Sequence, residues 1–391
     1  MKMSHALLAA ALPLLGGAGC ASAETADLNR GVTVALTGID TFKVYESEEK
    51  PGHNAWPAVF QDSDGGLCVV FQQVTGDLKR KSDYSFLNPG KEFVIKLIGM
   101  RMAKGETRFR KIWEKTMMKP HSFVIPAPTP SRDGRMIAIC RPTASPDFAG
   151  LPEESAVIAE SADYGKTLTV RSVIHAPGIQ LVPNDIRYIG DSLFAATYDG
   201  KGGAHLFESK DDGRTWSAPF EIVRMHDNMS FHEPTFTQLG DGSLAVFLRT
   251  HRMDIPKHNG INYHKTVLSR TPEGSWRATP VEDTGFGFRG RPYVLRSSGG
   301  VLILACPGQF LAFSRNDGRT WESGLWEFGI PEVTIVDAEG VKPFRWNAET
   351  TVHELPDGRF YYSWFLGSDY PFPPPCDEYI GGSFFRIDMV K

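Results

Sequence analysis

The chain has 391 residues, of which 41% are hydrophobic and 23% charged, a balance typical of a globular protein and not of a disordered one. Its formal net charge of −4 gives no support to binding of nucleic acid or of an acidic membrane surface. The 39 glycines, the 27 prolines and the 11% of aromatic residues predict many turns and an all-β fold.

Residues 1–23 have the pattern of a secretory signal peptide. A basic start at Lys2 leads into an apolar run from Ala6 and then into small residues, and the run is too short for a membrane-spanning helix. Cleavage after Ala23 predicts an exported protein, either periplasmic or secreted. Cys20 offers the alternative of a lipid-anchored lipoprotein, although Gly17 stands where such signals usually carry Leu or Val.

The cysteines of the remaining chain do not form a pattern for metal or disulfide chemistry. Cys68, Cys140 and Cys306 lie in apolar runs, which favours buried free thiols over a disulfide framework, and Cys376 lies in a proline-rich loop. No CxxC pair is present, so we expect no zinc site, and no motif calls for a cofactor.

Four short stretches along the chain share one frame and recur at intervals of about 45 to 60 residues, a period typical of propellers or solenoids. Most begin with Ser and carry Asp or Asn third, Gly fifth and Thr seventh. The stretches are SADYGKTL (161–168), SKDDGRTW (209–216), SRTPEGSW (269–276), which keeps only the ends of the frame, and SRNDGRTW (314–321). Ser and Asp side chains bond nearby backbone N–H groups and Gly supplies a positive φ, so the frame predicts a tight β-turn. Calcium binding is disfavoured, because Ile222 stands where a calcium loop needs its distal glutamate.

A second series of turns marks six short hairpins, each between two runs of β-type residues. Their anchors are Asp64, Asp133, Gly190, Asp241, Ser298 and Asp357. Turns of the Asp-Gly type between apolar runs are strong hairpin signals. The spacing of the anchors predicts six units, each long enough for four strands.

The Ser-x-Asp-x-Gly-x-Thr-Trp element resembles the Asp box of the sialidase-like (BNR-repeat) six-bladed β-propellers. The resemblance covers roughly residues 40–391 and implies a single propeller domain of four-stranded antiparallel blades. It also implies that these turns lie between the two outer strands of a blade, away from the substrate face. The element is specific for the fold and not for an activity.

The hairpin anchors also predict which residues surround the propeller axis. Residues eight positions before and after an anchor are expected to be neighbours across the hairpin, at the end nearest the axis. Those that we select as candidate site residues are Trp56, Glu233, Glu349, Arg141, Tyr198 and Arg249, with Arg291 one position out of frame. Charges near an axis are costly without partners, so we predict a substrate pocket, with rim ion pairs as the alternative. Asp185 either faces this pocket or caps a turn.

The stretch FHEPTFTQLGDGSLAVFLRT (231–250) resembles the sialidase segment in which a Glu opens the first strand of a blade and an Arg closes the second. The resemblance implies that Glu233 supports a nucleophile and that Arg249 binds a sugar carboxylate.

Other sialidase positions are not kept. Ala55 stands in place of the first-blade Arg, and the stretch 305–314 has no Arg where the family has its third. Asn347, Ala348 and Glu349 stand where the nucleophilic Tyr would open the last blade, and the family's acid Asp has only Asp77 and Asp83 as counterparts. These departures argue against ordinary sialic acid hydrolysis.

The sequence therefore predicts an exported, monomeric glycoside hydrolase that acts on a terminal acidic sugar or on a bond next to one. Glu233 and Glu349 would form the carboxylate pair that such chemistry needs. A polysaccharide lyase that uses His232 or Tyr198 to abstract a proton is one alternative. A glycan-binding propeller without catalysis is the other. We expect no metal and no cofactor.

Overall fold

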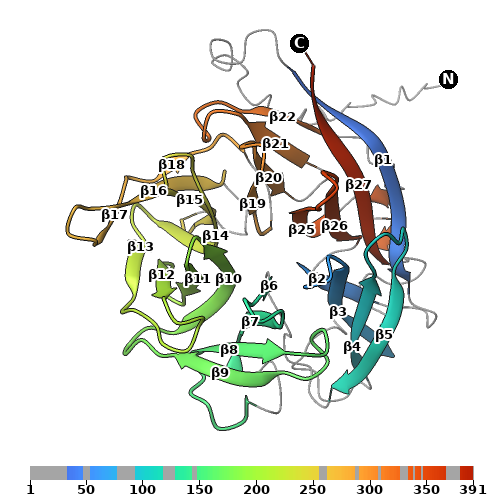
Figure 1. Ribbon diagram of the computed structural model, residues 1–391, viewed down its shortest axis with the longest axis horizontal. Coiled ribbons are helices and arrows are strands. Elements are labelled where there is room, and N and C mark those ends of the chain that lie inside the picture. The colour runs from blue at the N-terminus through green and yellow to red at the C-terminus, as the bar shows by residue number, and fades with distance from the viewer. Residues whose placement is uncertain are drawn as a thin grey trace, which may run out of the picture.

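The computed structural model describes residues 33–46, 53–76, 93–117, 128–142, 148–254, 262–286, 290–306, 310–325, 333–337, 340–344, 347–366 and 379–390. Six antiparallel sheets surround a central axis, which confirms the predicted all-β, six-bladed β-propeller (Figure 1). The signal segment, Cys376, Asp77 and Asp83 lie outside the described residues.

Each blade is a sheet of four strands, with one further strand on blade 4. Blade 1 contains β2 (His53–Gln61), β3 (Leu67–Gly76), β4 (Phe93–Met102) and β5 (Arg110–Met117). Blade 2 contains β6 (Thr129–Pro130), β7 (Met136–Cys140), β8 (Ala156–Ser161) and β9 (Thr169–Ile174). Blade 3 contains β10 (Leu181–Ile189), β11 (Ser192–Asp199), β12 (Ala204–Ser209) and β13 (Phe220–Val223).

The second half of the ring repeats this arrangement. Blade 4 contains β14 (Met229–Gln238), β15 (Leu244–Arg252), β16 (His264–Arg270), β17 (Trp276–Ala278) and the short β18 (Glu282–Asp283). Blade 5 contains β19 (Tyr293–Arg296), β20 (Leu302–Cys306), β21 (Phe310–Ser314) and β22 (Glu322–Leu325). Blade 6 contains β25 (Asn347–Glu354), β26 (Phe360–Leu366), β27 (Tyr379–Val390) and β1 (Thr33–Glu46), and a separate hairpin pairs β23 (Val333–Asp337) with β24 (Gly340–Phe344).

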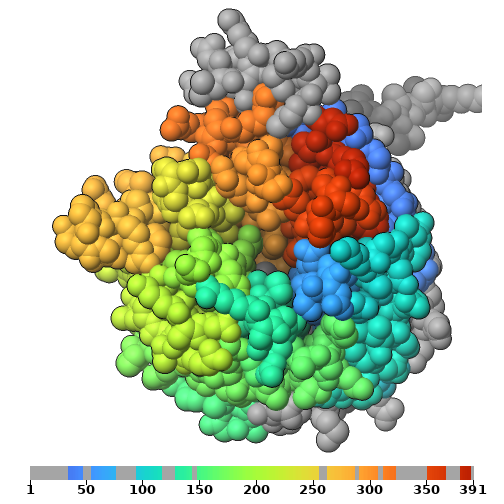
Figure 2. All heavy atoms as spheres, viewed as in Figure 1, coloured from blue at the N-terminus to red at the C-terminus, as the bar shows by residue number. Residues whose placement is uncertain are grey.

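The first strand of every blade is the innermost, as predicted. The six inner strands β2, β6, β10, β14, β19 and β25 contact one another in sequence around the axis. Figure 2 shows the same ring filled by side chains, with neighbouring blades in contact. The ring is closed by β1, which pairs antiparallel with β27, so the two ends of the described chain share one blade (Figure 1).

Both series of turns lie where the sequence predicts them. All six hairpin anchors lie between the first and second strands of their blades, and the four Ser-initiated turns lie between the third and fourth. In the turn after β12, the Ser209 hydroxyl donates to Asp211 Oδ1 at 2.8 Å and accepts from the backbone N–H of Gly213 at 2.8 Å. Gly213 has a φ of 79°, and the Asp211 carboxylate also accepts from the backbone N–H of Thr215 at 2.8 Å. The turns at 161–168 and 314–321 repeat these bonds.

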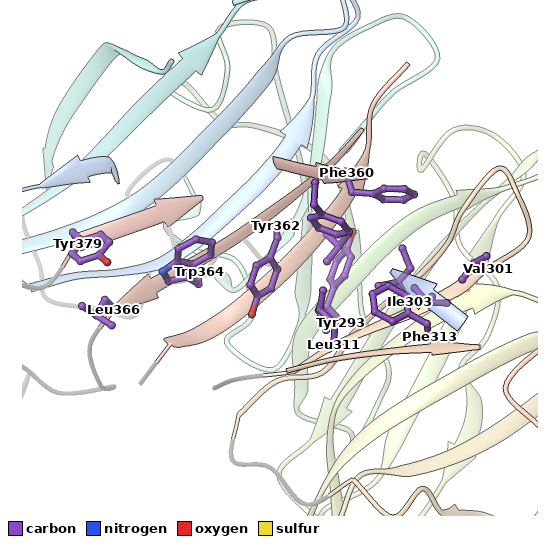
Figure 3. Close-up of a cluster of buried hydrophobic side chains, with 14 residues drawn as sticks. Tyr293, Val301, Ile303, Leu311, Phe313, Phe360, Tyr362, Trp364, Leu366 and Tyr379 are labelled. Carbon is purple, nitrogen blue, oxygen red and sulfur yellow. The ribbon is translucent and has the colours of Figure 1, made fainter. Parts of the chain in front are cut away.

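The hydrophobic core consists of clusters between neighbouring blades. Figure 3 shows the cluster between blades 5 and 6, where Trp364 and Tyr362 of β26 lie with their ring centroids 5.2 Å apart. Trp364 is fully buried because it lies across Gly381 of β27, where an added Cβ would meet its ring at 2.4 Å. Cys68, Cys140 and Cys306 are buried in such clusters as free thiols, as predicted.

Candidate functional site

A cavity of about 110 Å³ lies near the axis, at the ends of the inner strands farthest from the hairpin turns. Its lining comes from blades 1 to 5 and consists of Trp56, Arg141, Val182, Pro183, Asn184, Tyr198, Glu233 and Arg291. Five residues predicted for the site therefore share one cavity, although they come from five different blades and are far apart in the sequence. Among the described lining residues Glu233 is the one carboxylate beside the guanidinium groups of Arg141 and Arg291, so this described lining carries more positive than negative charge.

Two lining residues have an uncommon backbone conformation. Trp56 has a φ of 56° and Glu233 a φ of 48°, values that non-glycine residues rarely adopt. Each is followed by proline and lies within a β-bulge of an inner strand, between Ala55 and Ala58 in β2 and between His232 and Thr235 in β14. The bulges change the direction of both side chains relative to a regular strand.

The hairpin spacing identified the correct ends of the strands, with a shift of one residue at these bulges. Val182 and Tyr198 are paired across β10 and β11, as predicted. Arg249 is paired with His232 instead of with Glu233, because the extra residue of the bulge displaces the register.

The Glu233 carboxylate is held by an arginine from the neighbouring strand. Arg249 Nη1 lies 3.1 Å from both carboxylate oxygens of Glu233. Arg249 is not part of the cavity lining. It compensates the charge of Glu233, whereas Arg141 and Arg291 line the cavity directly. Arg291 is only 5% exposed, so its position is fixed by the surrounding protein.

Tyr198 and His232 lie beside this carboxylate. Burial, together with the negative charge of Glu233, raises the pKa of Tyr198 to about 12, so its hydroxyl is protonated at neutral pH. The ring of His232 lies edge-on to that of Tyr198 at 5.1 Å, and its Nε2 is 2.9 Å from the Ser230 hydroxyl. Burial lowers the pKa of His232, and His232 does not line the cavity.

Asp185 and Glu349 lie elsewhere on the inner strands. Asp185 is 1% exposed and forms an ion pair with Arg187 at 2.6 Å, outside the lining of the cavity. Glu349 occupies a bulge of β25 between Ala348 and Thr351, the counterpart of the Glu233 bulge two blades away. The side chain of Glu349 lies outside the described part of the structure.

Asn184 is a lining residue that the sequence reasoning missed. It lies in a bulge of β10 between Pro183 and Asp185, two residues after the predicted position Val182. Proline inside a strand is confined to edge strands and bulges, and the inner strand of each blade is an edge strand that pairs only with the second strand. Pro57, Pro183 and Pro234 were therefore the available signal for the bulges in β2, β10 and β14.

The part of the chain that the structure describes contains no group of three His, Cys, Asp or Glu side chains arranged to hold a metal ion. Within the same residues, no helix has the length and apolar character needed to span a bilayer.

Below the cavity, His353 of β25 makes stability depend on pH. Burial lowers its pKa to about 3, and the positive charge of Arg187 adds to this effect. The unfolded chain binds the same proton with a pKa of about 6.5. The neutral imidazole therefore contributes its full stabilisation above about pH 6.5, and this contribution is lost as the pH falls toward 3.

We expect the free energy of unfolding to fall by roughly 1.4 kcal/mol per pH unit below pH 6.5, relative to a His353→Gln variant. Urea unfolding of both proteins at pH 7, 6 and 5 measures this difference. The exposed His175 provides the control, since His175→Gln should keep the wild-type slope. Parallel stability curves for wild type and His353→Gln would contradict the prediction.

Solved structures with the same architecture support the fold. A protein of unknown function from Dyadobacter fermentans is 16% identical, with a TM-score of 0.61 over 92% of this chain and 100% of that chain. An α-L-arabinanase of Penicillium chrysogenum, solved with arabinobiose, is 13% identical, with a TM-score of 0.54 over 90% of this chain and 98% of that chain. A leech intramolecular trans-sialidase, solved with 2,7-anhydro-Neu5Ac, is 9% identical, with a TM-score of 0.52 over 90% of this chain and 70% of that chain.

No protein-family model matches the chain, and no curated protein is similar to it in sequence. At these identities the structural likeness concerns the fold. Three features of this chain agree with that fold: the order of the blades, the inner position of their first strands and the outer position of the Ser-initiated turns. The chain therefore has the fold of the sialidase-like six-bladed β-propellers.

Proposed function

We propose that the protein is an exported glycoside hydrolase that releases a terminal sugar carrying a carboxylate. The observation that carries this proposal is the axial cavity, where the carboxylate of Glu233, the hydroxyl of Tyr198 and the guanidinium groups of Arg141 and Arg291 converge. Export rests on the signal-like residues 1–23.

The charge of the cavity favours an acidic sugar. A guanidinium group binds a carboxylate through two parallel hydrogen bonds, which makes arginine the usual partner of that group. Arg141 and Arg291 line the cavity and Arg249 does not, so the carboxylate of the substrate would meet Arg141 and Arg291. The volume of about 110 Å³ is small beside the ~300–1,000 Å³ of sites for larger ligands, which favours binding of one terminal unit.

The chemistry would depend on two carboxyl groups. Glycosidases generally use one carboxyl group as the acid and a second as the base or nucleophile. Glu233 would be the base or nucleophile, because its carboxylate lines the cavity and is oriented by Arg249. Glu349, in the corresponding bulge of β25, would be its partner. The hydroxyl of Tyr198, protonated at neutral pH, would donate a hydrogen bond to the sugar.

The structural neighbours are consistent with this class of reaction. The Penicillium protein is an arabinanase and the leech protein a trans-sialidase, so this fold carries enzymes that act on neutral and on acidic sugars. The choice between these two classes of sugar rests on the arginines of the cavity.

Turnover of a glycan panel tests the proposal. The panel contains sialosides, oligosaccharides ending in a uronic acid, and neutral aryl glycosides including arabinofuranosides. We expect release of an acidic monosaccharide, detected by chromatography. Release of a neutral sugar alone would overturn the acidic preference. An unsaturated product absorbing in the ultraviolet would instead identify a lyase, and saturable binding without turnover would identify a glycan-binding propeller.

A further inference from the structure

The strained conformation of Glu233 needs support from its surroundings. A non-glycine residue with positive φ costs about 1–3 kcal/mol and persists only where neighbouring structure determines it. The following residue, Pro234, adds a constraint, since proline disfavours helical backbone angles in the residue before it. The structure must therefore contain contacts that fix the two residues after Glu233.

Those contacts come from β10 of the preceding blade. Asn184 Nδ2 donates to the carbonyl oxygen of Pro234 at 2.8 Å, and Asn184 is only 4% exposed. The hydroxyl of the next residue, Thr235, donates to Asp185 Oδ2 at 2.8 Å and accepts from Arg187 Nη2 at 2.9 Å. Three polar side chains of one strand thus hold two consecutive residues of another.

The same group of side chains extends to a third blade. Arg187 forms an ion pair with Asp185 and also donates to the carbonyl oxygen of Val294 in β19, which links blades 3, 4 and 5. A buried ion pair is weak evidence for stability, because desolvation offsets much of its attraction. Here the ion pair positions Thr235, since both charged side chains hydrogen-bond to the Thr235 hydroxyl.

We propose that Asn184 is a positioning residue for Glu233, and that Thr235, held by Asp185 and Arg187, is its second support. The proposal rests on the proposed function in so far as Glu233 is taken as the reacting carboxylate. Asn184 would act through the backbone of Pro234, by fixing the bulge that directs the Glu233 carboxylate into the cavity and toward Arg249. Losing this support would displace the carboxylate without removing it.

Three variants test the proposal. Asn184→Ala and Asn184→Asp both remove the donor to Pro234, and the aspartate keeps the size of the side chain. Thr235→Val removes the hydroxyl at nearly constant shape, and Thr235 does not line the cavity, so its effect cannot arise from a lost substrate contact. Ser172→Ala is the matched control, because Ser172 also donates to a backbone carbonyl of the next blade, that of Gly213, at 2.6 Å.

We expect kcat to fall about a hundredfold in each of the three variants, with KM changed less than about threefold, since a displacement near 1 Å can cost that much. Ser172→Ala should lower the melting temperature and leave kcat unchanged. An unchanged kcat in all three variants would overturn the proposal, and so would a rise in KM alone, which indicates a lost binding contact.

Crystal structures of wild type and Asn184→Ala give a second readout that needs no turnover. We expect Glu233 in the variant to leave its φ of 48° and to lose its contact with Arg249. Retention of both in the variant would overturn the positioning role, whatever the enzyme does. If wild type turned over no glycan, the proposed function would fail and this comparison would still decide the positioning role.

Discussion

Replacing Glu233 by glutamine should lower turnover of the acidic glycan about a thousandfold, within the range of roughly 10²–10⁴ for a positioned acid or base. Glutamine has the shape of glutamate and keeps the bulge of β14, but it cannot take up a proton or attack an anomeric carbon. Glu233 is the one carboxylate in the described lining of the cavity. Initial rates with the substrate found by the panel measure the loss.

The control is a glutamate with a similar environment outside the cavity. Glu208 of β12 is also paired with an arginine, Arg270 of β16, and its side chain is 10% exposed compared with 19% for Glu233. Glu208→Gln should change the melting temperature and keep the wild-type rate. A Glu233→Gln variant that turns over within tenfold of wild type would remove Glu233 from the chemistry.

The features of the fold that could be predicted from the sequence are those set by neighbouring residues in the chain. The turn at Ser209–Trp216 depends on one serine, one aspartate and one glycine within five positions, and the structure shows the expected bonds. The hairpin at Asp241 likewise fixes its own register. All six blades repeat the hairpin turn and blades 2 to 5 repeat the Ser-initiated turn, so the sequence predicted the number of blades and the inner position of their first strands.

The parts that could not be predicted depend on contacts between blades. Asn184 and Pro234 are 50 positions apart, and their hydrogen bond exists only because β10 and β14 lie side by side at the axis. The ion pair of Asp185 with Arg187 lies within β10, but its contact with the Thr235 hydroxyl again exists only because β14 lies beside β10. The position of the N-terminal strand β1 in blade 6 also depends on closure of the whole ring.

The prolines explain the one-residue error at Glu233. An alternating strand would have paired Glu233 with Arg249, and the structure instead pairs His232 with Arg249 and places Glu233 in a bulge. The proline that follows Glu233 lacks the N–H group that a regular inner strand would use. The residue most central to the site is therefore also the residue at which the local strand pattern fails, as expected of a functional position.

The arginines near the cavity should separate into two classes by their effect on substrate preference. Arg291→Met should lower kcat/KM about a hundredfold for the acidic substrate, since removing a buried charged partner costs about 2–5 kcal/mol. Its effect on a neutral aryl glycoside should be less than about threefold. Arg291 is 5% exposed and lines the cavity, so its charge meets the ligand with little screening by water.

Arg249→Met should act differently, because Arg249 contacts Glu233 and not the cavity. It should lower turnover of acidic and neutral substrates by a similar factor, since it changes the position and charge of the carboxylate that both would use. Arg296→Met is the control on blade 5, because Arg296 is partly exposed and faces Asp317. If Arg291→Met lowered kcat/KM equally for the acidic and the neutral substrate, Arg291 would not bind the carboxylate of the substrate. The acidic preference would then lose its main physical support.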